Sequence, residues 1–223
     1  MQLGTQAARA MDTRGLAADN RRLMRLDAHQ HFWRYDPKLY GWIGDGMEVL
    51  RRDFTPADLA PELTTAGIDG CIAVQARQDL TETRELLEYA RTSDIVRGVV
   101  GWVDLQSDEL DAQLDEFTAD PAFVGVRHVV QDEPDDEFLL RPQFVRGVSR
   151  LAERGLTYDL LIYTKHLKAA RAFVQQLPEQ PVVLDHLAKP PIAAGDLEPW
   201  ASDLRALAQH ENVLCKVSGM VTE

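Results

Sequence analysis

Residues 24–33 read MRLDAHQHFW, a short run typical of a β-strand that ends in polar side chains. In an extended strand, side chains two residues apart lie on one face, so Asp27, His29 and His31 are predicted to point the same way. Two imidazoles at one strand end can bind Zn²⁺ or donate hydrogen bonds to a carbonyl oxygen. Two ordinary surface histidines also give this pattern. The surrounding fold therefore decides whether the pair belongs to a functional site.

Six further β-type runs follow along the chain, and amphipathic helical patterns separate most of them. The runs cover residues 70–75, 96–105, 123–130, 156–163, 181–187 and 212–219. Strand–helix alternation of this kind indicates right-handed βαβ units and a parallel sheet. The runs are apolar almost to their last residues, which is typical of a sheet buried on both faces.

Polar side chains gather at the ends of all seven runs. They are His29 and His31, Gln75, Asp104, Arg127 and His128, Asp159, Asp185 and His186, and Lys216 with Ser218. A TIM-type (β/α) barrel carries its active site at these strand ends, whereas a doubly wound sheet would place a glycine-rich loop after the first strand, and none is present. The sequence therefore predicts an α/β fold, a TIM-type barrel with seven of its eight strands.

Composition limits the partners and the location of the chain. Among 223 residues there are 24 Lys and Arg against 36 Asp and Glu, a formal charge of −12 that disfavours nucleic acid and membrane surfaces. Cys71 and Cys215 lie in apolar runs and are predicted to be buried free thiols, which fits the cytoplasm. Residues 1–23 are predicted to be a disordered extension, and residues 24–223 one incomplete (β/α)8 domain.

The run LDHLAKP at 184–190 supplies a further candidate for chemistry. Because neighbours on a strand face opposite sides, only one of Asp185 and His186 is expected in the site. We choose His186 as catalytic and expect Asp185 to order a loop. Arg127 can hold a carboxylate or lactone oxygen through its fork of donors, or form an ion pair with Asp104 or Asp159.

Several other polar or aromatic residues are candidates for the wall of the site. Gln75, Trp102 and Asp159 are expected to bind substrate, Trp42 is expected to act as a lid or to staple a loop, and Asp104, Lys216 and Ser218 are further candidates. Acyl transfer by serine or cysteine is not supported, because the chain has no GxSxG motif and no cysteine beside a histidine.

Taken together, these motifs resemble the sugar-lactonase branch of the amidohydrolase superfamily, the group of L-fuconolactonase and L-rhamnono-lactonase. The motifs are DAHQHFW at 27–33, GWVDL at 101–105, GVRHV at 125–129, LDHLAKP at 184–190 and KVSGM at 216–220. The resemblance implies a distorted TIM barrel that opens a sugar-acid lactone. It implies that His29, His31 and His186 polarise the ring carbonyl and that Arg127 grips the substrate.

The resemblance also makes a metal conditional, since some members use a divalent ion and others do not. A zinc ion would be held by His29 and His31. In this family an eighth strand that reads like GSDWP carries the base that activates water, and no segment here matches it. We therefore expect weak or no turnover. We also expect self-association through the open edge of the sheet. Two alternatives stay open, namely a metal-dependent decarboxylase or hydrolase of another carbonyl substrate, and a non-catalytic binding protein.

Overall fold

The computed structural model describes residues 24–223. Seven parallel strands form one sheet in which each strand pairs with its neighbours in sequence order. They are β1 (Leu26–Gln30), β2 (Gly70–Val74), β3 (Val96–Gly101), β4 (Phe123–Val129), β5 (Thr157–Leu161), β6 (Val182–Leu184) and β7 (Val213–Cys215). The expectation of a disordered extension over 1–23 lies outside the described residues.

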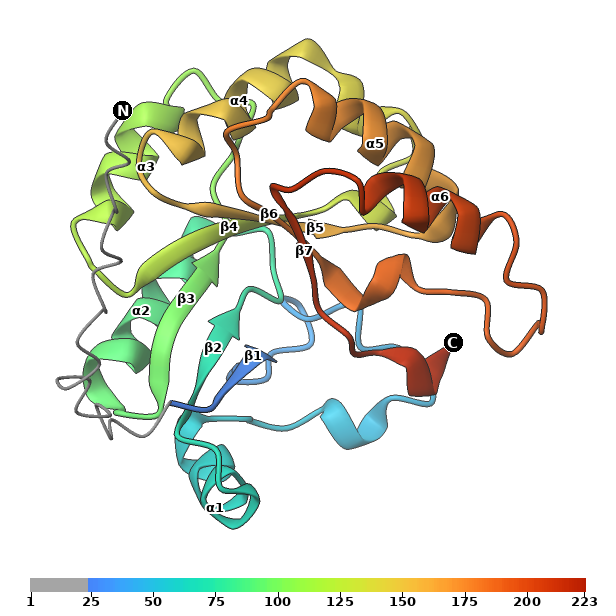
Figure 1. The fold of residues 1–223 in the computed structure, drawn as a ribbon. Coiled ribbons are helices and arrows are strands. Elements are labelled where there is room, and N and C mark those ends of the chain that lie inside the picture. Colours follow the sequence, from blue (N-terminus) through green and yellow to red (C-terminus); the bar gives the residue numbers. More distant parts are fainter. Residues whose placement is uncertain (1–23) are drawn as a thin grey trace, which may run out of the picture.

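The sheet curls as in a TIM-type barrel, and its helices lie along the outer side (Figure 1). This confirms the predicted fold class. The helices are α1 (Pro56–Ala66), α2 (Leu80–Thr92), α3 (Leu110–Thr118), α4 (Pro142–Ala152), α5 (Leu167–Gln175) and α6 (Trp200–Leu207). Short 3-10 turns connect them at η1 (Glu48–Leu50), η2 (Val130–Asp132), η3 (Phe138–Leu140), η4 (Thr164–His166), η5 (Asp185–Ala188) and η6 (Met220–Thr222).

Helix α1 shows how local sequence sets an element boundary. The Thr55 hydroxyl and the Asp58 carboxylate form a capping box, Pro56 occupies the first helical position, and Gly67 ends the helix in the left-handed conformation. Helix α3 begins at Leu110, three residues after Ser107, the serine nearest its start. The Ser107 hydroxyl turns the chain ahead of the helix by accepting the Glu109 N–H.

The main core lies between the sheet and the helices. Aromatic rings from α4, α5 and β5 meet there, with Phe144, Tyr158 and Phe173 in mutual edge or tilted contact. A smaller apolar cluster of Trp33, Tyr40 and Ile43 forms within the segment between β1 and α1. The polar ends of the strands are therefore held on a well-packed frame.

In the described part of the chain, β1 and β7 each pair with a strand on one side only. Strand β7 is correspondingly open, and the side chain of Leu214 is 68% exposed. The thiol of Cys71 is buried as predicted, but Cys215 is exposed, so the prediction for this residue was wrong. An apolar run indicates burial only where a neighbour covers both faces of the strand.

Among the helices of residues 24–223, none combines the length and apolar character that crossing a membrane requires.

Close packing of α4 against the β3–α3 connection gives a test of this fold. An added Cβ at Gly147 would overlap the carbonyl oxygen of Leu105. We expect Gly147→Ala to lower the free energy of unfolding by about 1–3 kcal/mol, measured by urea denaturation. Gly44→Ala is the control, since its added Cβ meets nothing within 4 Å, and equal stability of both variants would contradict this packing.

Candidate functional site

The two histidines of the HxH motif lie together at the carboxyl end of β1. The Nε2 atoms of His29 and His31 are 3.1 Å apart, and Nδ1 of His31 lies 2.8 Å from the carbonyl oxygen of Val74. Asp27 does not join them, because its carboxylate accepts hydrogen bonds from the backbone of His29 and the side chain of Gln30. The structure therefore brings the histidine pair together and leaves Asp27 to shape the strand end.

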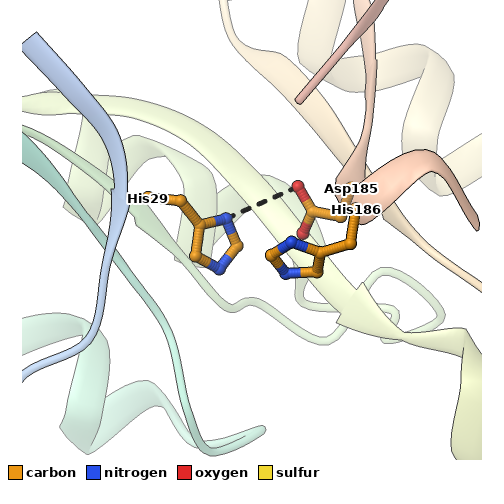
Figure 2. A group of neighbouring side chains, drawn as sticks. All are labelled: His29, Asp185 and His186. Carbon is orange, nitrogen blue, oxygen red and sulfur yellow. Dashed lines mark ion pairs between the residues drawn. The ribbon is translucent and has the colours of Figure 1, made fainter. Parts of the chain in front are cut away.

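Both Asp185 and His186 reach the same place, contrary to the expectation that only one could. The strand rule fails because β6 ends at Leu184 and the chain enters η5, where His186 has a φ of +50°. Figure 2 shows both side chains facing His29, with Nδ1 of His29 3.6 Å from Oδ1 of Asp185. The rings of His29 and His186 are 4.5 Å apart between centroids.

This turn continues in the left-handed region for four residues. After His186, the φ angles of Leu187, Ala188 and Lys189 are +54°, +56° and +51°. Gly219 packs against the turn from the other side, where an added Cβ would lie 3.0 Å from Cβ of His186. The close approach of this glycine and the backbone turn together fix the direction of the imidazole.

The carboxylate of Asp185 is fully buried between two cations. Its Oδ2 lies 3.1 Å from Nη1 of Arg127, and its Oδ1 lies 3.0 Å from Nζ of Lys216. Burial alone raises the pKa of Asp185, but its contact with the His29 ring and the charges of Arg127 and Lys216 outweigh it. The pKa of this carboxyl therefore lies well below its ordinary value, and the group is ionised at neutral pH.

Lys216 lies at the centre of the cluster, although the sequence marked it only as a further candidate. Its Nζ donates to Oδ2 of Asp159 and lies 3.1 Å from Nδ1 of His29. Burial and the nearby charge of Asp185 raise the pKa of Asp159 to about 6, against the opposing effect of Lys216. A buried lysine after an apolar strand was the signal that could have identified it, because such a charge needs partners.

Arg127 pairs with Asp185, and not with Asp104 or Asp159 as one open alternative had it. Its Nη2 also donates to the backbone carbonyl oxygen of Gln75 and lies 3.1 Å from the side-chain oxygen of that residue. Gln75 is fully buried, and its side-chain amide donates a hydrogen bond of 3.3 Å to the Arg127 carbonyl oxygen. The guanidinium is thus fixed from behind while it lines the pocket.

A pocket of roughly 280 Å³ opens beside these groups. Its polar lining comes from His31, Arg127, His186, Lys189, Gln131 and Asp132. Trp42 also lines it, is half-exposed and packs edge-on against Trp33 at 5.9 Å between ring centroids, so a lid and a loop staple both remain predictions.

Three residues expected in the wall are not among those that line this pocket. Gln75 and Asp159 hold Arg127 and Lys216 from behind, because both side chains are buried at the ends of their strands. Trp102 is bonded through its backbone to the hydroxyl of Thr83 in α2. His128, also at a strand end, bonds Glu133 at 2.7 Å and stacks on Phe138.

A larger cavity, of about 470 Å³, lies between α2 and the segment after β1. Its buried carboxylate is Glu82, which accepts the backbone N–H groups of Ala76 and Arg77 at 3.0 and 2.7 Å. Burial raises the pKa of Glu82 to about 7. Because this carboxylate holds the turn that follows Gln75, we assign it a structural role and place the chemistry in the histidine pocket.

The three histidines of the site are neutral at neutral pH. Burial lowers the pKa of His29 to about 4, although Asp185 opposes the change, and burial also lowers the pKa values of His31 and His186. One set of tautomers satisfies the shortest contacts: Lys216 donates to Nδ1 of His29, Nε2–H of His29 donates to His31, and Nδ1–H of His31 donates to Val74. The hydroxyl of Ser218 lies 2.9 Å from Nδ1 of His186, and in the tautomer whose Nδ1 accepts from this hydroxyl, Nε2–H can donate.

A group suited to a divalent metal is also present. His29, Asp185 and His186 offer ligand atoms within 4.8 Å of one another, and imidazole nitrogen with carboxylate oxygen is a donor set that zinc uses. Both oxygens of Asp185 already face a cation, Arg127 at Oδ2 and Lys216 at Oδ1. The residues therefore fit zinc by type, and a metal bound to Oδ1 would require the Lys216 ammonium to move.

Comparison with known proteins gives consistent matches. A sequence profile described as amidohydrolase matches residues 26–223. Two relatives named L-fucono-1,5-lactonase, from Burkholderia ambifaria and Burkholderia multivorans, are 39% and 40% identical over 89% and 90% of this chain and 69% of each relative. A crystal structure of an amidohydrolase from Burkholderia multivorans with bound zinc has a TM-score of 0.86 at 40% identity, covering 90% of this chain and 71% of that chain.

The buried carboxylate gives a first prediction. Asp185→Asn leaves Arg127 and Lys216 without their shared partner, so we expect the free energy of unfolding to fall by about 3–5 kcal/mol in urea denaturation. Asp135→Asn is the matched control, because its pair with Arg141 at 3.0 Å is solvent-exposed and is expected to be worth about 1 kcal/mol or less. Similar losses in both variants would show that burial of Asp185 carries no extra cost.

The low pKa of His29 gives a second prediction. The unfolded chain takes up this proton below the ordinary value of 6.5, but the folded protein takes it up only near pH 4. Stability is therefore lost as the pH falls from 6.5 towards 4, by roughly 3 kcal/mol from this group. Urea unfolding from pH 7 to 5 should show a shallower loss in His29→Gln than in the wild type or in His210→Gln, and three equal slopes would rule out this assignment.

Proposed function

The chain belongs to the amidohydrolase family, and on this basis we propose that it hydrolyses a sugar-acid lactone of the L-fucono-1,5-lactone class. The identity of about 40% to relatives with this named activity carries the proposal. The pocket at the strand ends, lined by His31, Arg127 and His186, supports it. This is where a barrel of this type holds its substrate. Decarboxylation and a purely binding role have no comparable support in residues 24–223.

His186 is the group we propose to polarise the lactone carbonyl. In the tautomer whose Nδ1 accepts from the Ser218 hydroxyl 2.9 Å away, Nε2–H donates into the pocket towards the carbonyl oxygen, where negative charge develops as water attacks. The guanidinium of Arg127 lines the same pocket and adds a fixed positive charge beside the ring. His31 is neutral, and in the tautomers given above its unprotonated Nε2 accepts the hydrogen bond from Nε2–H of His29.

The attacking water also needs a base, and this sets our expectation for the rate. The carboxylates next to the histidines are already paired, Asp185 with Arg127 and Lys216, and Asp159 with Lys216. A general base must lie within reach of the water and be free to take its proton. We therefore propose slow turnover for residues 24–223; a divalent ion, when bound, would supply an activated water instead.

Two further proposals concern the setting of the enzyme. The free thiols of Cys71 and Cys215 favour the cytoplasm, because such thiols persist in a reducing compartment. Self-association through the edge of β7 stays a proposal, supported by the exposed Leu214 and tested by the molecular mass in solution.

Hydrolysis and binding of L-fucono-1,5-lactone test the proposed function together. We expect the lactone to raise the melting temperature and the purified chain to accelerate ring opening above the spontaneous rate, followed with a pH indicator. His186→Asn should lower the catalysed rate by about 10²–10³-fold, the cost of losing one donor to the developing oxyanion. His210→Asn, at the opposite end of β7, is the control. A folded protein that neither binds the lactone nor speeds its opening would overturn the proposal.

A further inference from the structure

Three side chains of the kind that bind metals converge on one ammonium group in this protein. Nζ of Lys216 lies 3.0 Å from Oδ1 of Asp185 and 3.1 Å from Nδ1 of His29, and it donates to Oδ2 of Asp159. Two carboxylate oxygens and one imidazole nitrogen are also a common donor set for a divalent cation. The lysine thus occupies the centre of a cation site.

Because the cluster is buried, its charges must balance one another. The carboxylates of Asp159 and Asp185 are almost wholly buried, and the side chain of Lys216 is 10% exposed. Their two negative charges are balanced by the two positive charges of Lys216 and Arg127. A divalent ion added to the same cluster would leave an uncompensated charge of about +2 in a poorly hydrated region, which is unfavourable.

The atoms of the lysine and of the candidate metal group also overlap. The group of His29, Asp185 and His186 includes two of the residues that Nζ touches, His29 and Asp185. Oδ1 of Asp185 faces Lys216 while Oδ2 faces Arg127, so no oxygen of this carboxylate is free of a cation. Lysine and metal therefore compete for the same charge.

We propose that Lys216 is the resident cation of this cluster and restricts the binding of a divalent metal by holding Asp185 and His29. In the metal-free protein the ammonium compensates the carboxylates and fixes the histidine. Metal binding at Asp185 displaces Nζ towards Asp159. The inference concerns the pocket of the proposed function, but it depends on no substrate.

Titration with Zn²⁺ and with Co²⁺, whose visible absorption reports its coordination, tests the proposal on the full chain. Lys216→Met/Asp159→Asn removes one positive and one negative charge together, so the variant keeps the overall charge of the cluster and the whole His29–Asp185–His186 group. Compared with the wild type, it should bind Zn²⁺ about 10-fold more tightly or better by calorimetry, with a new Co²⁺ absorption band.

Lys189→Met is the matched control. Lys189 also lines the pocket, but its Nζ lies over the ring of Tyr163, 4.9 Å from the centroid. Its loss should change Zn²⁺ affinity by less than about 3-fold, because no ligand atom is released. Circular dichroism and a cooperative thermal unfolding transition without added metal establish that each variant is folded when it is titrated.

Two results would overturn the proposal. One is Zn²⁺ binding by the wild type as tight as by the double variant; the other is an equal gain in affinity in Lys189→Met, which would indicate a general charge effect. Neither result depends on lactone hydrolysis, so failure of this inference can be told apart from failure of the proposed function.

Discussion

The ionised carboxylate of Asp185, enclosed between Arg127 and Lys216, is the interaction on which the site depends. A buried charge without a partner would be strongly unfavourable, so the ends of β4, β6 and β7 must remain close enough to supply both cations. The same carboxylate lies beside His29 and so ties β1 to the far end of the sheet. One acidic side chain thereby connects groups at the ends of β1, β4, β6 and β7.

The fold could be predicted because its signals are local and repeated. Each strand is an apolar run with a polar end, and the capping residues of α1 can be recognised in the sequence. Parallel strands bring their carboxyl ends to one side, so the meeting of His29, Arg127 and His186 follows from topology alone. The amidohydrolase match then agrees with a resemblance based on the same motifs.

The detailed roles of the side chains could not be predicted, for two physical reasons. The alternation rule for Asp185 and His186 assumes a strand, and the chain leaves the strand at Leu184. Gln75 and Asp159 also lie at strand ends, but they are buried behind Arg127 and Lys216, and a sequence pattern does not separate a wall from its support. The central role of Lys216 depends on contacts across 187 positions of sequence with His29.

The turn from His186 to Lys189 keeps four L-amino acids at φ values near +50°, a conformation that costs each non-glycine residue roughly 1–2 kcal/mol. Glycine or asparagine would relieve that energy, so evolution towards a more robust scaffold should favour them here. Retaining bulkier residues keeps the loop stiff. Replacing these residues with glycine or asparagine to raise the melting temperature would consequently loosen the turn that orients the His186 imidazole.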